Sequence, residues 1–281
     1  MAYLKTSRRT IQIDRPLVMG ILNVTPDSFS DGGRFSSIDA AIKHVERLVN
    51  EGADIIDIGG ESTRPGSRQV SVDDEINRVV PLIEAVARRF DTPLSVDTTK
   101  SEVASRSIEA GAEIINDISG LRFDVRSAEV AAASGAGLVL MHSLGAFETM
   151  HGQPPVEDIF AEVMADLRRA VDFAHARGVS DEQIVLDIGL GFGKTFEQNL
   201  ELLAKLDKIV AELKGYPMLV GASRKSFIGK ICGDRPAPER IGGSVAAAVI
   251  AVQNGAKIVR VHDVAATVDA LRVGAAIGQR G

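Results

Sequence analysis

GADIIDIGGESTRPG, residues 52–66, combines a glycine, a short apolar run and a polar loop rich in glycine. Gly52 lies where a helix is expected to end, because glycine adopts the left-handed conformation of a helix C-terminus at little steric cost. The run 55–58 is apolar apart from Asp57, as in a parallel strand that is covered on both faces. Loops that follow such strands often carry function. The segment therefore predicts one repeat of an α/β architecture with a functional loop at 59–66.

The same pattern recurs along the chain. Short apolar runs alternate with longer amphipathic stretches, which indicates parallel strands with helices outside them. Eight runs are predicted as strands: 18–24, 55–58, 94–96, 114–116, 138–141, 184–187, 218–221 and 258–261. Their order predicts an α/β fold, a (β/α)8 TIM barrel, with residues 1–281 as a single domain. The alternative, an open doubly wound sheet, would need a glycine-rich phosphate loop before the first helix, and Gly20 is isolated within its strand.

Helix boundaries are predicted from capping residues. Ser71 and Asp74 open a helix that runs to about Phe90, since a serine oxygen accepts from free amides and an acid suits the positive end of the helix. Similar caps are predicted at Ser37, Ser180 and Thr195. Helix stops before strands are predicted at Gly52, Gly111, Gly178 and Gly255.

Composition limits the class of protein. The 281 residues are 45% hydrophobic and 25% charged, which suits a large core and not a disordered chain. The net charge of −6 argues against a general nucleic-acid binder. No apolar run reaches the roughly 18 residues of a membrane span. Cys232 is the only cysteine, which excludes an internal disulfide. These features predict a cytoplasmic protein without nucleic-acid or membrane partners.

Polar residues stand at the end of nearly every predicted strand. In a TIM barrel the active site lies at the carboxyl ends of the strands. Any one polar residue there could simply cap the next helix. Many of them around one mouth would be costly to bury unless they paired or met a ligand. They predict one active site, and they are Asn23, Asp57, Asp97, Asn116, Asp117, His142, Asp187, Arg260 and His262.

Residue types suggest what this site binds. Cations supplied by Arg64, Lys225 and Arg260, with His262, predict a small anionic substrate. Asn23 offers an oxygen to Mg²⁺, which uses few protein ligands together with water and phosphate. Asp97, Asn116 and Asp187 are acceptors for a heterocycle with several N–H groups, such as a pterin. The loops 25–33 and 59–66 are predicted to act as lids. GLGFGK, residues 189–194, resembles a dinucleotide fingerprint only in the spacing of its glycines, which is a weak signal by itself.

Several segments together resemble those of the dihydropteroate synthases. Two long segments are MGILNVTPDSFSDGG (19–33) and GADIIDIGGESTRPG (52–66). Shorter segments follow in order: SVDT (95–98), INDI (115–118), MH (141–142), GFGK (191–194), SRKS (223–226) and VRVHDV (259–264). The resemblance covers essentially the whole chain.

This resemblance implies a transferase of folate biosynthesis and a target of sulfonamides. Its reaction would join 6-hydroxymethyl-7,8-dihydropterin diphosphate to 4-aminobenzoate, giving 7,8-dihydropteroate and diphosphate, with Mg²⁺ as cofactor. By position, Asp97, Lys225 and Arg64 would be catalytic. The pterin would contact Asp97, Asn116, Asp187, Lys225 and Met141; the diphosphate Asn23, Arg64, Arg260 and His262; the aminobenzoate Thr63, Pro65, Phe192 and Ser226; and the metal Asn23.

Some positions depart from the pattern of that family. Ile188 stands where proline is common, Leu190 where phenylalanine is common, and the loop 143–150 is an unusual version. We expect these changes to touch the wall of the pterin pocket.

Two other functions and a homodimeric assembly are compatible with parts of this sequence. A barrel that moves a methyl group from methyltetrahydrofolate to a corrinoid partner needs the pterin residues but not the diphosphate cations. A catalytically silent pterin-binding or anion-binding module would usually have lost one of the matched residues. A homodimer is expected through the alanine-rich segment 245–252, although burial against the barrel explains that segment equally well.

Overall fold

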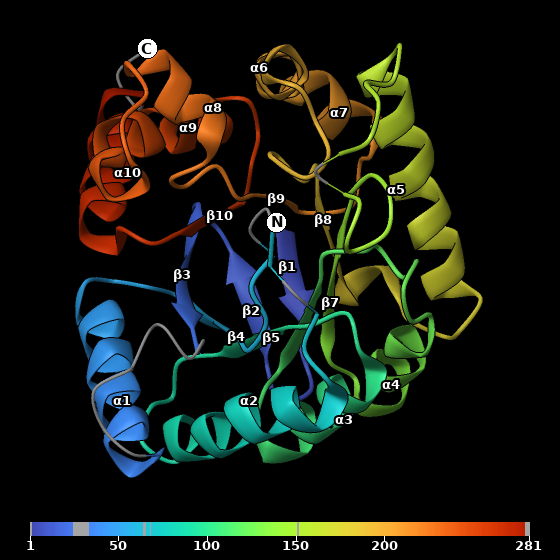
Figure 1. Ribbon diagram of the computed structural model, residues 1–281, viewed down its shortest axis with the longest axis vertical. Helices are drawn as coiled ribbons and strands as arrows, with labels where there is room; N and C mark the ends of the chain where they lie inside the picture. The colour runs from blue at the N-terminus through green and yellow to red at the C-terminus, as the bar shows by residue number, and fades with distance from the viewer. Residues whose placement is uncertain (1, 25–33, 64–65, 68, 151, 279–281) are drawn as a thin grey trace.

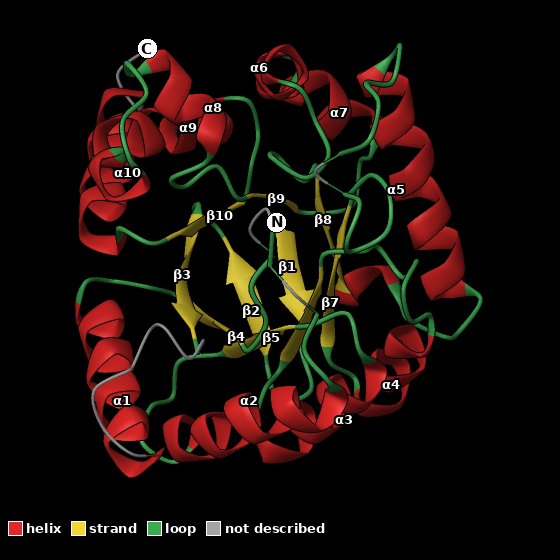
Figure 2. Ribbon diagram, viewed as in Figure 1, coloured by secondary structure: helices red, strands yellow, loops and turns green. Residues whose placement is uncertain are grey.

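A closed barrel of parallel strands forms the centre of the protein. The computed structural model describes residues 2–24, 34–63, 66–67, 69–150 and 152–278. The strands pair in the order β10-β3-β4-β5-β6-β7-β8-β9, shown in yellow in Figure 2. They are Leu17–Asn23 (β3), Ile55–Gly59 (β4), Leu94–Asp97 (β5), Ile114–Asp117 (β6), Gly137–Met141 (β7), Ile184–Asp187 (β8), Met218–Val220 (β9) and Ile258–Val261 (β10). The predicted TIM barrel is confirmed, and the predicted strands agree to within one residue at each end.

Helices surround the barrel as an outer ring (Figure 1). They are Arg34–Asn50 (α1), Val72–Ala87 (α2), Ser101–Ala110 (α3), Arg126–Ser134 (α4), Ile159–His175 (α5), Phe196–Ala204 (α6), Leu206–Glu212 (α7), Ser226–Ile231 (α8), Ile241–Gln253 (α9) and Val264–Gly278 (α10). Short 3-10 turns occupy Asp181–Gln183 and Ala237–Glu239. Within the described residues, no helix combines the length and apolarity needed to cross a bilayer.

Most of the predicted helix boundaries are confirmed. The Ser71 hydroxyl accepts from the backbone N–H of Asp74 at 3.1 Å, so α2 begins as predicted. Its end at Ala87 comes before the predicted Phe90. The prediction for Ser37 was wrong, because α1 begins earlier, at Arg34. Capping boxes form at Ser180 and Thr195. All the predicted stops have positive φ, at 98° for Gly52, 124° for Gly111, 88° for Gly178 and 102° for Gly255.

A hairpin that the sequence did not predict closes the amino end of the barrel. Strands Ala2–Lys5 (β1) and Thr10–Ile13 (β2) pair antiparallel and lie across the middle of the ring in Figure 1. Leu4 and Ile13 pack on an inner apolar layer that includes Met19, Ile55 and Ile258. This layer fills the interior of the barrel next to the hairpin, at the amino end of the strands. The carboxyl ends of the strands are left for a site.

Candidate active site

A continuous row of paired residues crosses four strands at the mouth of the barrel. Asn23 of β3 is in register with Gly59 of β4, Gly59 with Asp97 of β5, and Asp97 with Asn116 of β6. Paired residues of a parallel sheet point to the same face, which here is the barrel interior. A methyl group built on Gly59 would lie 3.5 Å from Asn23 Oδ1 and 3.7 Å from Asp97 Oδ2. The side-chain oxygens of Asn23 and Asp97 therefore border the same space next to Gly59.

Arg260 of β10 joins Asp97 of this row to Asp57, which lies deeper in the barrel. Its Nε donates to Asp57 Oδ2 at 2.6 Å, and its Nη2 donates to Asp97 Oδ2 at 2.6 Å. The Asn116 amide donates to the same Asp57 oxygen at 3.1 Å. The Asp57 side chain is 0% exposed and that of Asp97 is 14% exposed. Asp57 is thus an internal anchor, whereas Asp97 reaches the mouth.

Three ionisable groups of the mouth, Asp97, Asp187 and Lys225, have pKa values shifted toward neutrality. Burial raises the pKa of Asp97 to about 7, against the attraction of Arg260 and with added repulsion from Asp57. Burial also raises the pKa of Asp187 to about 6, which a backbone hydrogen bond from Gly189 opposes. The pKa of Lys225 falls to about 8 through burial and through repulsion by Arg260. Such clustering of shifted pKa values is typical of an active site.

Lys225, which follows β9, and Phe192, which follows β8, face each other at the mouth. The ammonium of Lys225 lies 3.9 Å from the centre of the Phe192 ring, in a cation–π contact. Asp187 ends β8, and its Oδ1 accepts from the backbone N–H of Gly189 at 2.8 Å. Asp187 is in register with Met141 of β7, so a carboxylate, a thioether, an aromatic ring and a cation border one space.

An apolar cluster forms the wall of that space. Its members are Ile118, Met141, Phe147, Met150 and Phe192, with Phe123 packed against them. Phe147 and Met150 come from the loop 143–150, so the expectation that this loop touches the pocket wall fits their position. The same expectation was wrong for two other positions. Ile188 and Leu190 pack in the core between strands and helices and not in the wall cluster, because they follow the end of β8 and alternate with the inward-facing Asp187.

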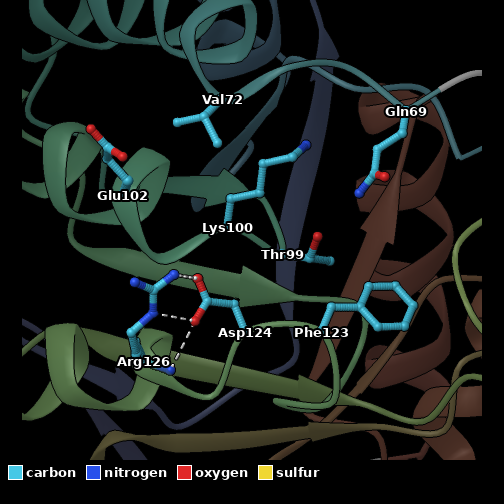
Figure 3. Close-up of a pocket in the computed structure, with 8 residues that line it drawn as sticks. All are labelled: Gln69, Val72, Thr99, Lys100, Glu102, Phe123, Asp124 and Arg126. Atoms are coloured by element: carbon cyan, nitrogen blue, oxygen red, sulfur yellow. Dashed lines mark hydrogen bonds and ion pairs between the residues drawn. The ribbon is translucent and has the colours of Figure 1, made fainter.

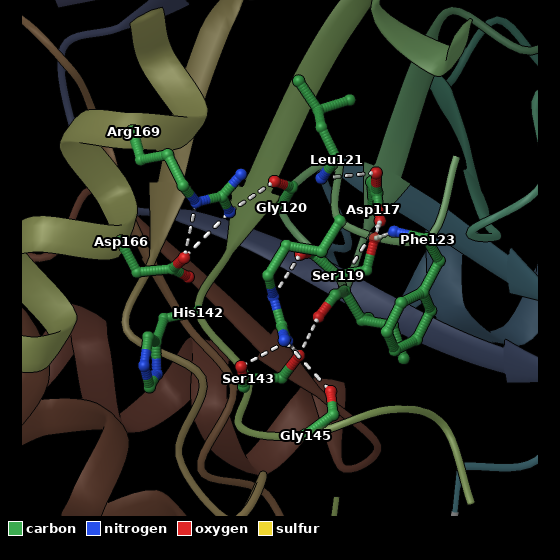
Figure 4. A network of polar contacts seen from close by, with 12 residues as sticks. Asp117, Ser119, Gly120, Leu121, Phe123, His142, Ser143, Gly145, Asp166 and Arg169 are labelled. Atoms are coloured by element: carbon green, nitrogen blue, oxygen red, sulfur yellow. Dashed lines mark hydrogen bonds and ion pairs between the residues drawn. The ribbon is translucent and has the colours of Figure 1, made fainter. Parts of the chain in front are cut away.

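A polar network fixes the loop 143–150 (Figure 4). The Asp117 carboxylate accepts from the N–H groups of Ser119 and Leu121 at 2.8 and 3.0 Å, which shapes the turn after β6. From this turn Arg122 donates to the carbonyl oxygens of Ser143 and Gly145. The same guanidinium donates to the Ser143 hydroxyl at 2.6 Å. The turn after β6 therefore holds the loop that supplies Phe147 and Met150.

The remaining candidate residues are placed as follows. His262 follows β10 and its Nδ1 lies 3.1 Å from the Ser223 hydroxyl. Ser226 is exposed at the first position of α8, directly after Lys225. Thr63 is half-buried in the loop after β4. Arg64 and Pro65, with the predicted lid 25–33, lie outside the described residues.

A buried charge cluster beside the mouth was missed by sequence reasoning. Lys100 Nζ lies 3.0 Å from Glu61 Oε1 and 2.5 Å from Glu75 Oε2. The same Glu61 oxygen accepts from the backbone N–H of Val70 at 2.5 Å, so the two ends of the loop after β4 are tied together. Glu61 lies on a loop, Glu75 in the first turn of α2 and Lys100 directly before α3. No local sequence pattern shows that these three residues meet. Lys100 also lines a cavity of about 220 Å³ with Phe123, Asp124 and Arg126 (Figure 3).

Comparison with known proteins identifies the family. The model of the pterin binding enzymes matches residues 19–262. A dihydropteroate synthase of Clostridium beijerinckii is 50% identical over 252 residues, 89% of this chain and 90% of that protein. A Xanthomonas albilineans dihydropteroate synthase solved with 4-aminobenzoic acid has a TM-score of 0.91 and 44% identity, covering 99% of both chains. A structure from the same organism in complex with 7,8-dihydropteroate has a TM-score of 0.88 and 43% identity, covering 98% of both chains. The chain belongs to the dihydropteroate synthase family of pterin binding enzymes.

Proposed function

We propose that this chain condenses 6-hydroxymethyl-7,8-dihydropterin diphosphate with 4-aminobenzoate, releasing 7,8-dihydropteroate and diphosphate, and so serves folate biosynthesis. The observation that carries the proposal is the set of inward-facing groups at the mouth: Asp97 held by Arg260, Asn116 in the same row, and Lys225 beside Asp187. Known relatives with this fold were solved with 4-aminobenzoic acid and with 7,8-dihydropteroate. The whole chain, residues 1–281, is proposed to act as one domain.

The pterin is proposed to bind among Asp97, Asn116, Asp187, Lys225 and Met141. Carboxylate and amide oxygens of the first three accept hydrogen bonds from the N–H groups of the heterocycle. Met141, which is 3% exposed, offers a polarisable surface within the apolar wall. This set suits a flat ring that is polar at its edge and apolar on its faces.

The aminobenzoate is proposed to lie farther out, near Thr63, Pro65, Phe192 and Ser226. Phe192 gives an aromatic face, and Ser226 is exposed at the start of α8. An aromatic ring packed beside Phe192 would gain burial in addition to an offset-stacked contact.

The diphosphate is proposed to bind Asn23, Arg64, Arg260 and His262. The oxygens of Asn23 and Asp97 around Gly59 fit a Mg²⁺ ion, which needs few protein ligands beside water and phosphate oxygens. No cluster of three or more histidine, cysteine or acidic ligands occurs in the described residues, and this ion does not need one. Asn23 would hold the Mg²⁺ ion. A bound Mg²⁺ ion would neutralise charge on the leaving diphosphate.

We propose that these groups act together in one displacement. The bond between the pterin methylene and the bridging oxygen breaks, and its electron pair leaves on the diphosphate, which Arg64, Arg260 and His262 stabilise. The cationic methylene is conjugated with the pterin and is stabilised by the Asp97 carboxylate. The neutral arylamine supplies the electron pair of the new C–N bond and then loses a proton to solvent. Asp97 and Arg64 are the proposed catalytic residues for these charges, and Lys225, beside Asp187, is proposed as the third catalytic residue because its cation borders the pterin.

The methyl-transfer alternative is less favoured. A methyltransferase barrel has no diphosphate to bind, so it has no use for a cation such as Arg260 held at the mouth by Asp57 and Asp97.

The experiment that tests the proposal measures diphosphate release with and without 4-aminobenzoate, in Mg²⁺ and in chelator. Release that needs both Mg²⁺ and the arylamine, in step with dihydropteroate formation, is the expected result. Tight pterin binding without turnover would favour the methyl-transfer or silent-module alternatives.

A bell-shaped pH dependence of kcat/KM is expected. Asp97 must be ionised, so activity rises with pH through its pKa of about 7. Lys225 must be protonated, so activity falls as pH rises through its pKa of about 8. The optimum therefore lies between these two values. Initial rates at constant ionic strength across this range check the prediction, and a flat profile through both values would contradict it.

A homodimer and a cytoplasmic location are also proposed. Exposed apolar side chains, Ile250 on α9 with Val273 and Ile277 on α10, occupy two helices that pack together in Figure 1. Within 245–252 itself, Ala247, Ala248 and Ala251 are buried against the barrel. Apolar residues left on an outer helix suit the isologous contact of a twofold dimer. Sedimentation is expected to give a dimer, and a monomer at all working concentrations would contradict this.

A further inference from the structure

The loop after β8 is built around one buried ammonium group. Lys194 Nζ donates to the carbonyl oxygen of Gly189 at 2.8 Å, with those of Phe192 and His142 at 3.3 and 3.4 Å. The same nitrogen lies 2.8 Å from His142 Nδ1, which accepts in the tautomer protonated on Nε2. Every donor of the ammonium is therefore directed at the segment 189–194 or at the end of β7.

Three glycines allow this loop to wrap so closely. Gly189, Gly191 and Gly193 have φ of 64°, 82° and 73°, which only glycine adopts without strain. A methyl group on Gly189 would lie 1.8 Å from the carbonyl oxygen of His142. One on Gly191 would lie 2.9 Å from Lys225 Cδ. The three glycines of 189–194 thus serve close packing against the end of β7 and against Lys225.

The loop carries one contact and one hydrogen bond of the site. Its Phe192 ring lies 3.9 Å from Lys225 Nζ, and its Gly189 N–H donates to Asp187 Oδ1. Phe192 is held by its own backbone carbonyl, which accepts from Lys194 at 3.3 Å. Asp187, in contrast, belongs to β8 and is paired on both sides in the barrel. Loss of the ammonium should therefore displace Phe192 more than Asp187.

A buried ammonium is costly unless its hydrogen bonds are satisfied. Here burial lowers the pKa of Lys194 to about 7, although Asp187 and Asp166 attract the charge. An apolar side chain would fill this space equally well. The ammonium at this position therefore has a role that depends on its hydrogen-bond donors.

We propose that Lys194 is a positioning residue that fixes Phe192 against Lys225 and thereby shapes the aminobenzoate side of the site. The inference rests on the proposed role of Phe192 and deepens it. Lys194 touches no substrate in this account and acts only through the loop.

A double-mutant cycle with Lys194→Met and Phe192→Ala tests the proposal. Each single change is expected to raise the KM for aminobenzoate about tenfold, and the KM for the pterin substrate by less than about threefold. The double variant is expected to match the worse single variant, because coupled residues do not add. Lys205→Met is the control; Lys205 pairs with Glu201 at the end of α6 and is half exposed, so its kinetics should not change.

Two outcomes would overturn the inference. Effects of Lys194→Met and Phe192→Ala that multiply in the double variant would show that Lys194 does not act through Phe192. A loss of thermal stability in Lys194→Met with both KM values unchanged would show a purely structural role. If Lys194→Met does not fold, His142→Leu removes the side-chain acceptor and leaves the backbone carbonyls, and the same coupling with Phe192→Ala is expected at smaller size. A native chain without synthase turnover would instead contradict the proposed function, and this inference with it.

Discussion

Replacing Asp97 by asparagine is expected to lower kcat by about 100- to 1000-fold, the usual effect of losing one fixed group that stabilises a transition-state charge. Asp97 is the carboxylate that both pairs with Arg260 and reaches the mouth. The amide keeps its shape but carries no charge to stabilise the cationic methylene. Initial rates at saturating substrates and pterin binding by calorimetry measure the two effects separately.

The matched control for this change is Asp91→Asn. The Asp91 side chain is 97% exposed and pairs with Arg9 far from the mouth, so its kcat should be unchanged. A kcat for Asp97→Asn within about threefold of the unaltered chain would remove Asp97 from the proposed mechanism.

Replacing Arg260 by methionine is expected to lower the free energy of unfolding by about 3–5 kcal/mol, because it leaves a buried charge without its partner. Asp57 is fully buried and would keep only the Asn116 amide as a donor to its paired oxygen. Activity should be lost as well, since Asp97 and the diphosphate both depend on this guanidinium. Urea denaturation followed by circular dichroism measures the change in stability.

Two comparisons make the Arg260 result specific. The double variant Arg260→Met, Asp57→Asn should recover part of the stability without recovering activity, because it removes the unpaired charge. Arg88→Met breaks the exposed pair with Glu84 and should cost no more than about 1 kcal/mol. Equal losses from Arg260→Met and Arg88→Met would contradict the buried-triad account.

The barrel could be predicted because each of its strands carries its own local signal. Runs such as Ile184–Asp187 are apolar, short and bounded by helix caps or glycines, and the structure has the strand at the predicted bounds. The hairpin of β1 and β2 lacks such a signal. AYLK and TIQI alternate polar and apolar residues over only a few positions, and what makes them strands is the inner layer that Leu4 and Ile13 cover.

The location of the site could be predicted, but not its internal pairing. Polar residues after parallel strands meet at one end of a barrel, which is a rule of topology and needs no coordinates. Asp57 and Arg260 are 203 residues apart, and no local pattern shows that they touch. The same holds for Lys194, whose partner His142 follows another strand. The residues that reach the mouth can therefore be predicted from the sequence. Which of them hold other side chains in place, and which are available to contact substrate, depends on the fold.

A crystal structure with bound 7,8-dihydropteroate shows directly where the product lies. The pterin ring is expected between Asp97, Asn116 and Asp187, beside Lys225, with the benzoate portion extending toward Phe192 and Ser226. Product bound instead in the cavity beside Lys100 and Arg126 (Figure 3), with the barrel mouth unchanged, would contradict this placement.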